Sequence, residues 1–75
     1  MNKYQDLDNL ILARITRFAG SSFSELFQGP ILSECERLNT LTNREPFRIL
    51  DGRLTSLRNS KKAVYEKGFG WKIPE

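Results

Sequence analysis

The 75-residue chain contains no histidine, one cysteine and one tryptophan. Without histidine, the commonest general base and metal ligand is missing. One cysteine cannot build a structural zinc site. Neither a glycine-rich phosphate loop nor a serine nucleophile elbow occurs. We therefore expect that the protein is not an enzyme and has no cofactor, no metal and no small-molecule substrate.

Long apolar runs and paired cysteines are also missing. No apolar run approaches the ~20 residues that a membrane span needs, so we expect no membrane partner. The lone Cys35 cannot form an internal disulfide, which fits a reducing cytoplasm. A hydrophobic content of 39% and a charged content of 28% are typical of a folded domain. We expect one cytoplasmic domain over residues 1–75, with a small core because a chain this short buries only about 60% of its unfolded surface.

Positive charge is concentrated in the second part of the chain. Residues 1–43 carry four Lys/Arg and five Asp/Glu, a net charge of −1. Residues 44–75 carry eight Lys/Arg and four Asp/Glu, a net charge of +4. Clustered positive charge is the electrostatic footprint of a phosphate-backbone binder. A solvated basic face would show the same charge pattern.

Apolar periodicity predicts helices over residues 6–19, 22–28, 30–39 and 45–59. The stripe of the first helix is Leu7, Leu10, Ile11, Ile15 and Phe18. The second helix opens with Ser22 and Glu25, which have the spacing of a capping box. Pro30 is suited to the first turn of the third helix, whose apolar positions are Ile31, Cys35 and Leu38. Residues 39–43 are expected to form a loop, with Thr42 or Asn43 capping the next helix.

The fourth segment allows two interpretations. Asp51-Gly52 is a strong two-residue hairpin signal. A helix is favoured because it places an apolar stripe on one face and puts Pro46 in the first turn. Gly52 then costs that helix about 1 kcal/mol relative to Ala. The expected stripe is Phe47, Leu50, Leu54 and Leu57.

The chain ends in a predicted β-hairpin over residues 63–73, which turns at Lys67-Gly68. Alternation would point Val64, Trp71 and Ile73 inward, with Trp71 as the anchor. Two strands alone are marginally stable, so this hairpin must pack on the helices. The expected fold class is mainly α with a small C-terminal β-hairpin (α+β).

The outward face of the fourth helix has small residues near its centre and long polar residues at its ends. Such a surface can approach a duplex closely. Arg pairs bidentately with guanine and Asn with adenine, while Ser and Thr suit phosphates. We therefore expect double-stranded DNA as the partner. The candidate DNA-binding residues, including lysines on and before the hairpin, are Arg44, Arg48, Gly52, Thr55, Ser56, Arg58, Asn59, Lys61, Lys62 and Lys67.

The segment Arg48-Ile49-Leu50-Asp51-Gly52-Arg53-Leu54-Thr55-Ser56-Leu57-Arg58, followed by Val64-Tyr65-Glu66 and Gly70-Trp71-Lys72-Ile73, resembles the recognition helix and wing of winged helix-turn-helix domains. It is similar to those of small bacterial and phage transcriptional regulators. The resemblance covers residues 44–73 and implies three to four helices plus a wing. The first two helices would then be the first helix and the start of the helix-turn-helix. In the family a glycine usually ends the recognition helix, whereas Asn59-Ser60-Lys61 stands here.

The resemblance implies a DNA-binding transcriptional regulator of phage or mobile-element type. Its helix 45–59 would enter the major groove, and its wing 63–73 would lie on the backbone. The alternative is a winged-helix protein-protein interaction module, such as an antirepressor or a partner in a nucleoprotein complex, because fold does not settle function. A homodimer is possible, since regulators usually bind two half-sites through a two-fold axis.

Overall fold

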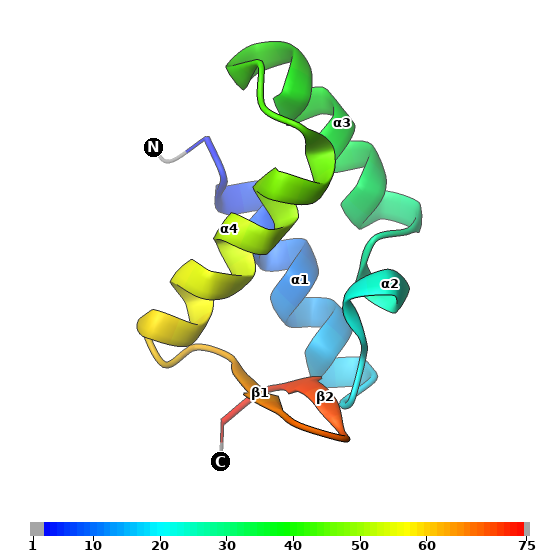
Figure 1. Cartoon of the computed structure of the whole chain (residues 1–75), viewed down its shortest axis with the longest axis vertical. Helices are drawn as coiled ribbons and strands as arrows, with labels where there is room; N and C mark the ends of the chain where they lie inside the picture. The colour runs from blue at the N-terminus through cyan, green and yellow to red at the C-terminus, as the bar shows by residue number, and fades with distance from the viewer. Residues whose placement is uncertain (1–2, 75) are drawn as a thin grey trace.

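The computed structural model describes residues 3–74, and Met1, Asn2 and Glu75 lie outside the described part. The elements are α1 (Gln5–Arg17), α2 (Phe23–Leu26), α3 (Gly29–Thr42), α4 (Pro46–Asn59), β1 (Val64–Glu66) and β2 (Gly70–Lys72). In Figure 1, α4 crosses in front of α1, and α3 rises beside them. The hairpin closes the end opposite the α3–α4 connection. The fold is therefore mainly helical with a two-stranded antiparallel hairpin, as the sequence predicts.

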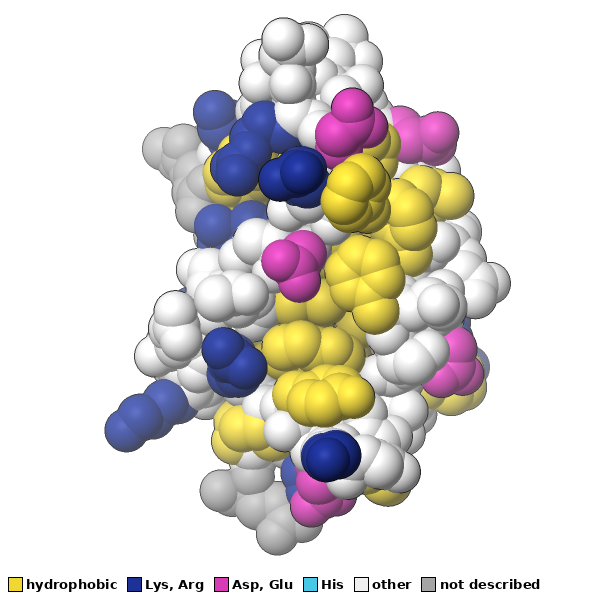
Figure 2. Space-filling model, viewed as in Figure 1, with side chains coloured by type: hydrophobic (Ala, Val, Ile, Leu, Met, Phe, Trp, Pro, Cys, Tyr) yellow, Lys and Arg dark blue, Asp and Glu magenta, His cyan; other side chains and the backbone are white. Residues whose placement is uncertain are grey.

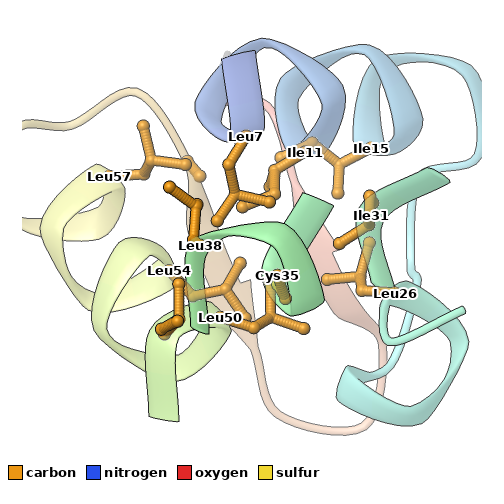
Figure 3. Packing of buried hydrophobic residues seen from close by; sticks show 12 residues of the cluster. Leu7, Ile11, Ile15, Leu26, Ile31, Cys35, Leu38, Leu50, Leu54 and Leu57 are labelled. Carbon is orange, nitrogen blue, oxygen red and sulfur yellow. The ribbon is translucent and has the colours of Figure 1, made fainter. Parts of the chain in front are cut away.

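A single apolar cluster holds the four helices together (Figure 3). Leu7, Ile11 and Ile15 of α1 face α3, as the periodicity predicts. The other buried members are Leu26, Ile31, Cys35, Leu38, Ile49, Leu50, Leu54, Leu57 and Ala63. Burying each large aliphatic side chain contributes about 1.5–3 kcal/mol, so this cluster is the main source of stability.

Local signals explain where three of the helices begin. Ser22 accepts a hydrogen bond from the Glu25 N–H, and Glu25 accepts one from the Ser22 N–H, which confirms the capping box. Proline stands in the first turn of both α3 and α4, where its missing N–H has no helical partner to lose. The continuous α4 also rules out a strand reversal at Asp51-Gly52.

The end of α3 differs from the expectation. The helix continues through residues 39–42 instead of forming a loop there, and Asn43 ends it in the left-handed conformation at φ 60°. Neither Thr42 nor Asn43 caps α4, whose N-cap is Glu45. Asn tolerates the left-handed region better than most residues, so Asn43 terminates the preceding helix instead.

Two other helix ends also differ from the prediction. Helix α1 ends at Arg17 instead of residue 19, which leaves Phe18 51% exposed and outside the stripe. Helix α2 has only four residues. Helix α4, by contrast, ends at Asn59 as predicted, and Ser60 is its C-cap. Lys61 takes a positive φ of 64° in the turn that follows, the backbone region that a family glycine would occupy.

The hairpin packs on the backbone that joins α1 to α2. Tyr65 pairs with Trp71 across the strands, and Trp71 also bridges to Ser21 through its backbone. A Cβ at Gly70 would lie 2.5 Å from the Gly20 carbonyl oxygen, so only glycine permits this approach. Trp71 packs against the core as expected. Ile73 is exposed, because the pairing between β1 and β2 ends at Lys72, one residue earlier.

Candidate nucleic-acid interface

The orientation of α4 on the core corrects the predicted apolar stripe. Ile49 is 2% exposed and Phe47 is 48% exposed, so Ile49 takes the buried position expected for Phe47. Both assignments satisfy helical periodicity, because Leu50 and Leu54 lie between them on the helix surface. The consequence is that Phe47 joins the exposed face.

An ion pair fixes this orientation. The Arg53 guanidinium donates to both carboxylate oxygens of Asp8 on α1, at 2.9 and 2.7 Å, and stacks 4.8 Å from the Tyr4 ring centroid. The Asp8 carboxylate raises the pKa of Arg53 further above its usual value. Bidentate geometry restricts both distance and rotation, so the pair sets how α4 turns against α1. The Arg53 side chain is therefore used in a contact within the fold.

The outward face of α4 agrees with the predicted arrangement. Arg48, Gly52, Thr55 and Asn59 are exposed, while Ser56 is half-buried. A Cβ added to Gly52 would meet no atom within 4 Å. The fold therefore gives no reason for this glycine in mid-helix, where it costs about 1 kcal/mol.

Six cationic side chains on α4, next to it or on the hairpin make no ion pair within the part of the chain that the structure describes. They are Arg44, Arg48, Arg58, Lys61, Lys62 and Lys67. Figure 2 shows basic groups along the α4 side of this view. Lys72, by contrast, lies 3.7 Å from Glu66. Cations without a carboxylate partner direct positive potential at solvent.

Two neighbouring surface hollows lie beside these cations and were not predicted from the sequence. Two adjoining cavities of about 480 and 490 Å³ share Phe23 of α2 and Asp51 of α4. We call the combined feature the aromatic groove. Its first cavity is lined by Tyr65, Phe69 and Trp71 of the hairpin. Figure 2 shows a corresponding apolar band down the middle of this face.

The second cavity of the aromatic groove lies between Phe47 and the cations Arg44 and Arg48. Gly52 also lines it, so the groove and the outward face of α4 share residues. Exposed aromatic rings are a signal that sequence inspection could have used, but only the docking of α4 decides that Phe47 faces outward. Asp51, considered in the sequence only as a turn signal, is exposed in the middle of the groove.

The buried thiol is a poor candidate for chemistry. Cys35 is 0% exposed within the core. Burial, with added repulsion from Glu34 and Glu36, raises its pKa to about 11. A thiol that stays protonated at neutral pH is a weak nucleophile. Cys35 therefore acts as a small apolar side chain.

Residues 3–74 provide neither a cluster of metal ligands nor a membrane-crossing helix. In this range no group of three or more Cys, Asp or Glu side chains could hold a metal ion. None of the four helices there combines the length and hydropathy of a membrane-crossing segment. Comparison with protein-family models, with curated proteins and with solved structures found no match.

Proposed function

We propose that the protein is a winged helix-turn-helix DNA-binding regulator of phage or mobile-element type, active in the cytoplasm. In this proposal α4 enters the major groove, and the hairpin lies along the neighbouring phosphates. The observation that carries it is the set of six cations on or near α4 and on the hairpin that make no ion pair within residues 3–74, together with a bare Gly52 on α4.

The dimensions of α4 support this proposal. An α-helix with its side chains is about 10–12 Å across, and the major groove is about 12 Å wide. Gly52 and Thr55 keep the middle of the helix thin, while Arg48 and Asn59 lie toward its two ends. Arg48 and Asn59 are suited to base edges, and Lys61, Lys62 and Lys67 to phosphates.

The connectivity also supports a helix-turn-helix, but at a different place from the one the resemblance implies. Only residues 43–45 separate α3 from α4, which matches the three- to four-residue turn of that motif. We therefore assign the motif to α3 and α4. The backbone of Ser21 makes one isolated antiparallel bridge to Trp71 of β2, beside the wing.

A titration of salt tests the proposal. We expect the full chain to bind a fluorescent random 30-base-pair duplex, with affinity falling steeply as salt rises. The slope of log K against log salt would be about −5 if all six cations meet phosphates. Absence of binding at low salt would reject DNA as the partner.

Charge-matched variants locate the interface. Arg48→Ala should weaken duplex binding roughly 5–100-fold, and Lys67→Ala should reduce the salt slope by about 1. The matched control is Arg37→Ala on α3, whose charge is already paired with Glu34 and which should have a small effect. Equal losses for Arg37→Ala and Arg48→Ala would indicate non-specific attraction.

We also propose that the protein binds DNA as a homodimer. A homodimer would place two copies of α4 on successive half-sites about 34 Å apart, and sedimentation with and without duplex DNA would measure the oligomeric state.

The second candidate function is a protein-interaction module, which the exposed aromatic groove favours. In that case Lys61→Ala together with Lys67→Ala, which line neither cavity, should leave partner binding nearly intact.

A further inference from the structure

The exposed aromatic rings of the groove are not used in the proposed contacts of α4 with DNA. Phe47 and Tyr65 are 48% and 52% exposed, and Phe69 is 48% exposed. Exposed rings gathered along one groove differ from the scattered apolar residues of an ordinary surface. Such patches mark interaction sites.

The charges along the groove alternate. Arg44 and Arg48 lie at one end, Asp51 lies in the middle and Arg58 lies at the other end. Arg48 and Arg58 are ten residues apart on α4, which corresponds to about 15 Å. An occupant with complementary charge therefore carries acidic groups about three helical turns apart.

A nucleic-acid strand fits this pattern poorly. Its phosphates repeat along the whole strand, so one of them would face the Asp51 carboxylate. The rings are also partly covered by one another, since Tyr65 and Trp71 contact each other in a tilted arrangement with 5.3 Å between centroids. A peptide can place carboxylates at the two ends and apolar or basic side chains between them.

We propose that the aromatic groove binds an amphipathic helical segment of a protein, with apolar side chains at helical spacing and acidic residues near both ends. Helix-in-groove recognition of this kind uses apolar anchors at i, i+3, i+4 and i+7. The rings of Phe23, Phe47 and Trp71 receive the anchors, while Arg48 and Arg58 pair with the acidic ends.

Occupation of the groove has a consequence for DNA binding. Arg48 and Gly52 line the second cavity and also belong to the outward face of α4. A helix seated there covers part of the surface that DNA would use, so peptide and duplex compete. This consequence rests on the proposed function, whereas binding in the groove does not.

A displayed library of random 16-residue peptides, selected on the full-length chain, identifies the occupant class without assuming a partner. Sequences that also bind an unrelated basic protein of similar size are removed. We expect the survivors to share apolar residues at helical spacing and Asp or Glu near both ends. No sequence preferring the native chain, or enrichment of basic sequences, would overturn the proposal.

Fluorescence of Trp71, the chain's only tryptophan, then measures each selected peptide in the absence of DNA. Phe47→Ala should weaken peptide binding at least tenfold. Phe18→Ala is the matched control, because Phe18 is equally exposed, lines neither cavity and should change affinity less than twofold. Asp51→Lys should weaken peptides that carry a central basic residue at least threefold while strengthening duplex binding.

Three outcomes would contradict the occupant we propose. Saturable quenching by a poly-dT oligonucleotide that displaces the peptide would make the groove a nucleic-acid platform. Dimerisation abolished by Phe47→Ala would make it a contact between two copies. Equal effects of Phe47→Ala and Phe18→Ala would remove the groove from the binding site. Failure of the duplex to bind, with peptide binding intact, would reject the proposed function alone.

Discussion

The two parts of the chain use their charged side chains differently. In residues 3–43, Arg37 pairs with Glu34, and Arg14 and Arg17 lie over the Phe18 ring. In residues 44–74, six of eight cations make no ion pair, and the two paired ones are Arg53 and Lys72. The first part is largely accounted for by the fold. The second part contains residues that the fold does not explain, and these are the candidates for function.

The largest expected effect separates neighbouring residues of α4. Leu50→Ala removes a fully buried side chain and should lower the free energy of unfolding by about 2–5 kcal/mol. Phe47→Ala removes a half-exposed ring and should lower it by less than about 1 kcal/mol. Urea unfolding followed by Trp71 fluorescence measures both. Equal losses would mean that Phe47 belongs to the core and would break the comparison.

The second largest effect is expected from the ion pair between Asp8 and Arg53, which joins the two parts of the chain. Asp8→Ala leaves the Arg53 guanidinium without its carboxylate, at a cost of about 2 kcal/mol. This is below the loss for a fully buried pair, because the two side chains are 13% and 19% exposed. Adding Arg53→Met to Asp8→Ala should restore part of the stability, since an apolar side chain leaves no unpaired charge. A double variant less stable than the single one would show that Arg53 acts mainly through its contact with Tyr4.

Replacing Gly52 is expected to have a smaller effect, which raises stability but weakens DNA binding. Gly52→Ala should raise the free energy of unfolding by about 0.5–1 kcal/mol, because alanine is the better helix former and the site is open. The same variant should weaken duplex binding, since the added methyl group stands where the partner approaches. Thermal unfolding and duplex titration measure the pair of effects. Unchanged or tighter DNA binding would place Gly52 outside the interface.

The smallest expected effect tests the capping box of α2. Hydrogen bonds from Ser22 lower the pKa of Glu25 below its ordinary value of 4.5. A lowered pKa stabilises the fold fully above that ordinary value, and the contribution is lost as pH falls through the lowered pKa. The native chain should therefore unfold at a slightly higher temperature than Glu25→Gln at pH 7, and the two should converge at low pH. A difference independent of pH would assign the effect to packing.

Much of the fold could be predicted from the sequence because its signals are local. The Ser22–Glu25 capping box, the prolines of α3 and α4 and the spacing of Ile31, Cys35 and Leu38 each act within a few residues. The basic outward face of α4 could also be predicted, because helical period alone puts Arg48, Thr55 and Asn59 on one side.

The aromatic groove could not be predicted in the same way. Periodicity allows either Phe47 or Ile49 to extend the Leu50 and Leu54 stripe, so the sequence leaves the rotation of α4 undecided. The Arg53–Asp8 pair joins residues 45 positions apart, and no local pattern reveals it. Phe23 and Trp71 reach the groove only after α2 and the hairpin dock.

The sequence by itself determined the helical segments, the hairpin and the concentration of positive charge after residue 43, because propensity, capping and period act between near neighbours. Tertiary structure alone decided which side of α4 is buried and that Arg53 forms an ion pair with Asp8. It also decided that Phe47 and Asp51 line the same groove. Those outcomes depend on contacts between distant segments, which form only when the helices pack into one core.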